Sequence, residues 1–113
     1  SYWSIDKVKA MARKQWKLLY SAFQSLKPGG VMVYSTCTFA PEENEAQITR
    51  LLKRFPDQVN IKPVALSIDN TQTGIAQWHN KKYHADVTQT TRILPNNEMG
   101  AFYVALLEKS LHS

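Results

Sequence analysis

A turn, a short apolar strand, the only cysteine and the start of a helix follow one another in the first half of the chain. The run is Leu26-Lys27-Pro28-Gly29-Gly30-Val31-Met32-Val33-Tyr34-Ser35-Thr36-Cys37-Thr38, and shortly after it comes Pro41-Glu42-Glu43-Asn44-Glu45. Pro28-Gly29-Gly30 breaks a helix and turns the chain. Residues 31–35 are β-branched and aromatic without alternation, which favours a strand covered on both faces, as in parallel α/β sheets. This region is therefore restricted to a strand–loop–helix unit.

Helices are predicted on both sides of this unit. Residues 4–26 place side chains in one stripe at alternating steps of three and four, with Ser4 as N-cap and Trp3 as hydrophobic staple. The stripe is formed by Ile5, Val8, Ala12, Gln15, Leu19, Ala22 and Leu26. Gln15 interrupts the stripe, and its amide is expected to bond to a neighbouring backbone group. The second helix is expected over 41–55, because proline suits a first turn and glutamates complement the positive end of the helix dipole.

The rest of the chain predicts further strands. They are expected over 59–66, around 92–94 and over 101–108. Residues 67–91 lack periodicity and are expected to form an irregular loop region. The order helix, strand, helix, strand, loop, strand indicates an α/β sheet layer. A chain of 113 residues is long enough for one core, so we expect a single α/β domain over 1–113.

The net charge of +5 is concentrated at the beginning of the chain. Residues 1–27 hold six basic side chains against one acidic one, whereas the remainder holds eight of each sign. A localised basic face favours an anionic partner such as nucleic acid, although many lysine-rich helices are simply solvated. Trp78 and Tyr83 flank lysines that suit single-stranded RNA, or they cover the edge of the core. The candidate RNA-binding residues are Lys7, Lys9, Arg13, Lys14, Lys17, Lys81 and Lys82.

The composition excludes several classes of protein. A single cysteine excludes an internal disulfide and a zinc cluster, and it makes the cytoplasm the expected compartment. No apolar run approaches the ~18–20 residues of a membrane span, and the first residues do not resemble a signal peptide, so no membrane partner is expected. His79 and His84 lack a third ligand at persuasive spacing, so no metal site is expected.

Two interpretations of Cys37 stay open from the residues alone. The carboxyl end of a strand is the edge at which open α/β sheets bind ligands, and a helix N-terminus near Pro41 would favour a thiolate. Free cysteine is also among the most buried residue types, so the alternative is a small side chain in the core.

Three blocks of the sequence resemble the RNA cytosine-5 methyltransferases of the Sun-domain family, and most closely its bacterial ribosomal RNA branch. The resemblance implies the C-terminal portion of a Rossmann-like class I methyltransferase sheet, incomplete as a domain. The blocks are Trp3-Ser4 with Gln15, Ser21-Ala22-Phe23 and Leu26-Lys27-Pro28-Gly29-Gly30; Val33-Tyr34-Ser35-Thr36-Cys37-Thr38 with Pro41-Glu42-Glu43-Asn44-Glu45; and Arg92-Ile93-Leu94-Pro95 with Gly100-Ala101-Phe102-Tyr103-Val104-Ala105.

The resemblance implies a catalytic role for Cys37. In this family the Thr-Cys cysteine attacks carbon 6 of the target cytosine, and carbon 5 then takes the methyl group of S-adenosylmethionine. The family's glycine-rich cofactor loop and its Asp and Pro-Cys motif lie upstream and are missing from this sequence. We therefore expect no cofactor binding and no turnover by this chain alone.

The resemblance also implies partners. RNA is the expected substrate, with ribosomal RNA preferred to transfer RNA. An uncovered sheet edge predicts self-association or pairing with a missing N-terminal half. The alternative function is a non-catalytic module that binds RNA or a protein through the basic helix and residues 78–84.

Overall fold

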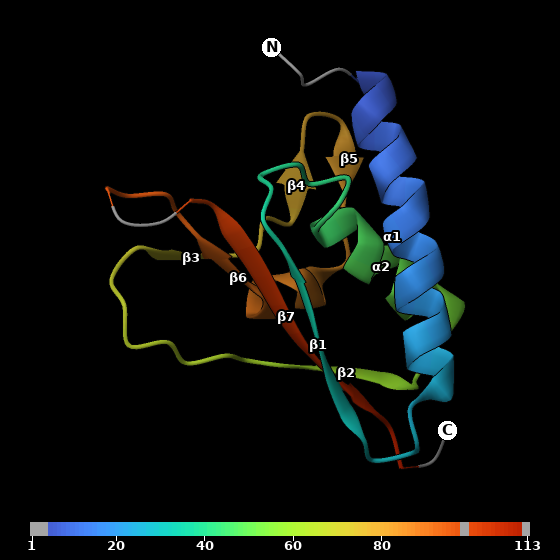
Figure 1. Cartoon of the computed structure of the whole chain (residues 1–113). Helices are drawn as coiled ribbons and strands as arrows, with labels where there is room; N and C mark the ends of the chain where they lie inside the picture. Colours follow the sequence, from blue (N-terminus) through green and yellow to red (C-terminus); the bar gives the residue numbers. More distant parts are fainter. Residues whose placement is uncertain (1–4, 98–99, 112–113) are drawn as a thin grey trace.

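The chain forms two layers, with two helices packed on one face of a five-stranded sheet (Figure 1). The structure is a computed structural model that describes residues 5–97 and 100–111. Its elements are α1 (Ile5–Ser25), β1 (Val31–Thr36), α2 (Glu45–Arg54), β2 (Val59–Lys62), β3 (Thr71–Thr73), β4 (Gln77–Trp78), β5 (Lys81–Lys82), the 3-10 helix η1 (Ala85–Gln89), β6 (Thr91–Ile93) and β7 (Phe102–Lys109).

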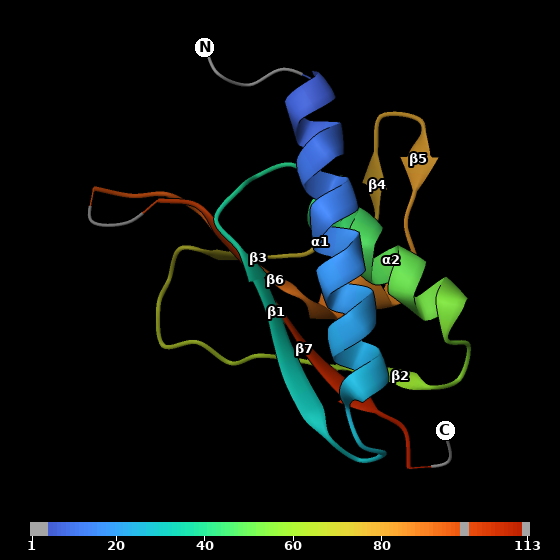
Figure 2. The same cartoon turned by 45° about the vertical axis from the view of Figure 1, so that its right-hand side comes forward.

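The long strand β7 organises the sheet. It pairs antiparallel with β1 along one side, and on its other side with β2 near its end and β6 near its beginning. β3 extends the sheet beyond β6, and β4 and β5 form a separate hairpin (Figure 2). The mixed α/β class is therefore confirmed. Every strand pair among the described residues is antiparallel, which differs from the parallel pairing expected for β1.

The prediction that β1 is covered on both faces is wrong for this chain. Tyr34 and Thr36 are buried, whereas the side chains of Val31 and Val33 are 57% and 59% exposed. Successive side chains of a strand point to opposite faces, and both helices pack on the face that holds Tyr34. An apolar run on both faces needs a layer on each side, and the described residues supply only one.

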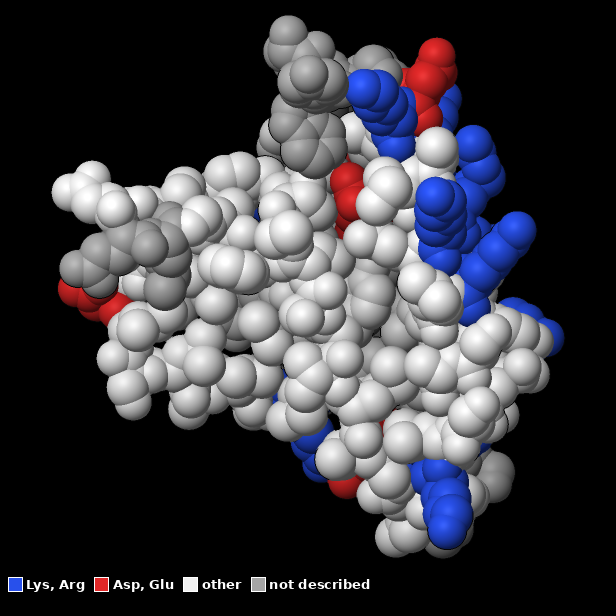
Figure 3. Space-filling model, viewed as in Figure 1, with Lys and Arg blue, Asp and Glu red and all other residues white. Residues whose placement is uncertain are grey.

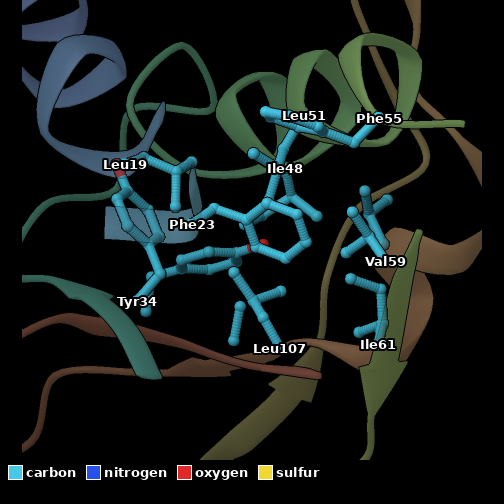
Figure 4. Close-up of a cluster of buried hydrophobic side chains, with 12 residues drawn as sticks. Leu19, Phe23, Tyr34, Ile48, Leu51, Phe55, Val59, Ile61 and Leu107 are labelled. Carbon is cyan, nitrogen blue, oxygen red and sulfur yellow. The ribbon is translucent and has the colours of Figure 1, made fainter. Parts of the chain in front are cut away.

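The core lies between the helices and the covered face of the sheet (Figure 4). Phe23 of α1 is fully buried and its ring centroid lies 4.9 Å from that of Phe55, at the end of α2. Leu19 is buried as expected, but Ala22 of the predicted stripe is exposed, because the buried face of α1 is centred on Leu19 and Phe23. The predicted cap Ser4 and staple Trp3 lie outside the described residues.

The second helix begins later than the prediction. α2 starts at Glu45, and residues 41–44 form hydrogen-bonded turns in which the amides of Asn44 and Ala46 donate to the Pro41 carbonyl at 3.1 and 2.9 Å. Asn44 has φ −115° and ψ −97°, outside the helical region, so the helix cannot extend back to Pro41.

The later strands lie close to their predicted positions. β6 and β7 confirm the strands expected around 92–94 and over 101–108. β2 ends at Lys62, earlier than predicted, because Pro63 has no amide hydrogen for the ladder. Between Ser67 and Thr91 the structure places β3, the β4–β5 hairpin and η1.

Candidate active site

Cys37 lies directly after β1, and its side chain is exposed. It borders a hollow of about 350 Å³ whose wall is otherwise mostly apolar, lined by Cys37, Thr38, Phe39, Ala40 and Ala101. The alternative of a buried core cysteine is therefore wrong. A soft nucleophile at the mouth of a hollow can reach a small planar ligand, and this volume falls at the lower end of the range for ligand pockets.

The backbone on both sides of Cys37 is held by one buried amide. The hydroxyl of Thr36 donates to Asn44 Oδ1 at 2.5 Å, and Asn44 Nδ2 donates to the carbonyl of Thr38 at 2.9 Å. Thr38 Oγ1 in turn accepts from the Ala40 amide at 3.1 Å. Asn44 is fully buried. The residues before and after the cysteine are thus tied to the start of α2, which restricts the position of the sulfur.

A buried ion pair supports the same loop from β6. Arg92 donates from Nε and Nη2 to the two carboxylate oxygens of Glu45, each at 2.6 Å. Arg92 Nη1 also donates to the Phe39 carbonyl at 3.1 Å, and Glu45 Oε2 accepts from the Ile75 amide at 2.9 Å. Both charged side chains are almost completely buried. A bidentate pair of this kind fixes relative orientation as well as distance, so β6 holds the segment two residues after Cys37.

Sequence reasoning missed this pair. The sequence pattern places Glu45 among the glutamates at the positive end of a helix dipole and Arg92 in the strand around 92–94, and it does not pair the two. One signal was available: Arg92 stands beside Ile93 in a strand, and a charge in a buried strand requires a partner.

A second polar cluster joins α1 to the turn before α2. The Tyr34 hydroxyl donates to the Glu43 carbonyl at 2.6 Å, and the Gln15 carboxamide lies 3.4 Å from the same hydroxyl and bonds to the Glu43 carboxylate. The partners of Gln15 are therefore side chains, not the backbone group that was expected. Burial raises the pKa of Glu43, opposed by the Gln15 hydrogen bond and reinforced by Glu42. Glu43 Oε2 is buried and has no partner among the described residues.

Glu43→Gln is expected to stabilise the fold at neutral pH by about 1 kcal/mol, because it replaces a carboxylate whose charge is disfavoured by burial and by Glu42 with a neutral amide of the same shape. Because the pKa of Glu43 is raised in the folded state, the protonated acid favours folding. This contribution to stability is fully present below the unfolded-state pKa of Glu43 and is lost as pH rises through its folded-state pKa. The gain should therefore appear in urea unfolding at pH 7–8 and vanish near pH 3. Asp69→Asn removes an exposed carboxylate and serves as the control. A loss of stability at pH 7 would contradict the prediction.

The candidate RNA-binding residues fall into two groups. The five basic residues of α1 are exposed along one side of the helix (Figure 3), and none of them lines the hollow at Cys37. Lys81 and Lys82 form β5 and line a different hollow, beside Arg50 and Lys53 of α2.

The histidines have local roles in the backbone. His84 caps η1, since its Nδ1 accepts from the Asp86 amide at 3.1 Å. His79 occupies the left-handed region with φ 53° in the turn of the β4–β5 hairpin. Among residues 5–97 and 100–111, no three side chains of His, Cys, Asp or Glu are grouped to hold a metal ion. No helix in these ranges is long and apolar enough to cross a membrane.

The chain's glycines do not form a cradle for S-adenosylmethionine. Nucleotide-type cofactors bind where a glycine-rich loop follows a strand and opens a helix. Gly29 and Gly30 precede β1, Gly74 lies between β3 and β4, and Gly100 precedes β7. A side chain on Gly74 would lie 2.1 Å from the Val87 carbonyl oxygen, so that glycine serves close packing of the chain itself. None of these four glycines therefore stands in a loop that follows a strand and opens a helix.

Comparisons with known proteins converge on one family. The family model described as 16S rRNA methyltransferase RsmB/F matches residues 4–108. The tRNA (cytosine(49)-C(5))-methyltransferase of Pyrococcus abyssi is 42% identical over 108 residues, covering 95% of this chain and 34% of the relative. The ribosomal RNA small subunit methyltransferase F of Aeromonas salmonicida is 44% identical over 70 residues, covering 62% and 15%.

A solved structure agrees with these matches. The crystal structure of a methyltransferase homologue from Pyrococcus horikoshii superposes with a TM-score of 0.84 at 28% identity, covering 96% of this chain and 34% of that one. The chain therefore spans about a third or less of the length of the relatives that it matches.

Proposed function

The chain belongs to the 16S rRNA methyltransferase RsmB/F family, and on this premise we propose that it is the nucleophile-bearing portion of an S-adenosylmethionine-dependent RNA cytosine-5 methyltransferase. The relatives named above act on transfer RNA and ribosomal RNA. The observation that carries the proposal is the position of Cys37, exposed at a hollow and braced on both sides by Asn44.

The proposed chemistry of this chain is nucleophilic addition and elimination. The Cys37 thiolate attacks carbon 6 of a cytosine, a sulfur–carbon bond forms, and the electron pair of the 5,6 double bond moves to carbon 5. Once carbon 5 carries the methyl group, a base accepts its proton, the electron pair of that carbon–hydrogen bond restores the 5,6 double bond, and the sulfur–carbon bond breaks to release the thiolate. Phe39 is 48% exposed and lines the hollow, so its ring is available to stack on an unpaired base.

The test is complementation. The chain is mixed with a separately expressed N-terminal portion of a family member, S-adenosylmethionine and a cytosine-containing RNA, and 5-methylcytosine is measured by mass spectrometry. We expect methylation only in the complete mixture. Methylation by this chain alone, or no methylation although the two portions associate, would contradict the proposal.

A second candidate function rests on the exposed basic side of α1. In this alternative the chain is a non-catalytic module that binds RNA or a protein, with Lys7, Lys9, Arg13, Lys14, Lys17, Lys81 and Lys82 as the contacts. RNA binding that depends strongly on salt, together with no effect of Cys37→Ala in the complementation mixture, would favour it.

The uncovered face of β1 is proposed to associate with another chain. Val31 and Val33 are more than half exposed, and β1 has one side without a strand partner among the described residues. An apolar strand face without a covering layer packs against other apolar surfaces, and a strand edge without a partner pairs with further strands.

Self-association is therefore expected at micromolar concentration in sedimentation velocity, and Val33→Lys should shift the chain towards monomer. Leu18→Lys is the matched control, because Leu18 is 71% exposed on α1, away from the sheet. A monomeric unmodified chain, or an equal effect of both substitutions, would contradict this prediction.

A further inference from the structure

We propose that two adjoining hollows along α2 form one groove that binds the phosphate backbone of single-stranded RNA. The first has a volume of about 530 Å³ and is lined by residues of α1 and α2, and the second has about 320 Å³ and is lined by residues of α2 and of the segment 81–83. They share Arg50 and Lys53. The choice of RNA as the polyanion rests on the proposed function; the site itself does not include Cys37.

The groove carries a cluster of unneutralised positive charge. Five exposed cations line it, and no carboxylate does. Within residues 5–97 and 100–111 these five cations take part in no ion pair, unlike Lys62, which pairs with Glu108, and Arg92, which pairs with Glu45. Like charges gathered in a concave surface attract a polyanion. The five cations are Arg50, Lys53, Arg54, Lys81 and Lys82.

Aromatic rings hold two of these cations in place. The guanidinium carbon of Arg50 lies 4.3 Å from the centroid of the Trp16 ring. That of Arg54 lies 5.3 Å from the centroid of the Tyr20 ring, and Arg54 Nη2 donates to the Tyr20 hydroxyl at 3.1 Å. A guanidinium stacked on a ring can still present N–H groups at its edge to phosphate oxygens. Less side-chain entropy is lost on binding when the arginine is already ordered.

The hairpin makes a single strand the favoured ligand. Trp78 is 43% exposed and stands opposite Lys81 in the register of β4 and β5, so an aromatic surface lies next to a groove cation. Unpaired bases stack on such rings, whereas the bases of a duplex are already stacked inside it.

The groove begins near the candidate active site. Ala46 lines its second hollow, and Ala46 directly follows Glu45, the carboxylate whose partner Arg92 supports the Cys37 loop. From there the groove follows α2 to Arg54, about 12 Å at the rise of an α-helix. The end of the groove at Ala46 is therefore linked to the Cys37 loop through the Glu45–Arg92 pair.

The test measures the affinity of the chain for a labelled 12-nucleotide single-stranded RNA by fluorescence anisotropy, between 50 and 200 mM NaCl. The double variant Arg50→Gln/Lys53→Gln is expected to bind at least about tenfold more weakly at 50 mM, and its slope of log affinity against log salt should fall by about 1.4, for two lost phosphate contacts. The control Lys27→Gln/Lys62→Gln removes the same charge outside the groove and should change affinity less than twofold.

Three further results separate the explanations. A failed complementation experiment with intact groove binding would overturn the methyltransferase proposal and not the groove. Equal weakening by both double variants would overturn the groove, because it would show attraction by net charge alone. Equal or tighter binding of duplex RNA or of heparin would overturn single-stranded RNA as the ligand.

Discussion

Arg92→Met is expected to lower the free energy of unfolding by about 3–5 kcal/mol, because it leaves the carboxylate of Glu45 buried without its counter-charge. The arginine also donates to the Phe39 carbonyl, so the same change releases the loop that follows Cys37. Urea unfolding gives the free energy. The rate at which a maleimide labels the Cys37 thiol, measured under native conditions, reports on the loop.

Two related variants make this result interpretable. Glu45→Gln/Arg92→Met removes both charges, and the double variant should lose less stability than the sum of the single variants, since no uncompensated charge remains. Arg92→Lys keeps the charge but cannot reproduce the two parallel bonds, so its loss should be intermediate. If Arg92→Met has the same free energy of unfolding as the unmodified chain, the ion pair contributes little to stability.

Cys37→Ser is expected to reduce methyl transfer in the complementation mixture by about 10⁴-fold or more, the scale seen when a covalent nucleophile is removed. A hydroxyl at this position is a far weaker nucleophile than a thiolate at neutral pH. Because Cys37 is exposed, the substitution should leave the unfolding free energy and the association of the two portions unchanged. The readouts are 5-methylcytosine formation and urea unfolding.

The control for this variant is Ser67→Ala, which alters an exposed side chain outside β1 and outside the hollow at Cys37. It should retain full methylation. A Cys37→Ser mixture that methylates within tenfold of the unmodified one would remove Cys37 from the chemistry. A variant that loses stability as well would mean that the cysteine has a structural role.

Local elements of this fold were predictable because their causes lie within a few residues of one another. The three-and-four spacing of apolar side chains predicts α1, Pro28-Gly29-Gly30 predicts the turn before β1, and the run of branched residues before Cys37 predicts β1 itself. The start of α2 at Glu45 was harder to predict from the sequence. It depends on Asn44, whose side chain bonds to Thr36 and Thr38 and whose backbone is not helical.

By itself the sequence determined the order of α1, β1, α2, β2, β6 and β7, the charge on α1 and the resemblance of the residues around Thr36 and Cys37 to a methyltransferase family, but not β3, the β4–β5 hairpin or η1. Only the tertiary structure decided that Cys37 is exposed, that Glu45 and Arg92 meet across 47 residues, and that Arg50 and Lys53 stand beside the hairpin lysines. The reason is physical. Periodicity and turn chemistry act along the chain, whereas the partner of a buried charge and the neighbours of a surface cation are set by which distant elements pack together.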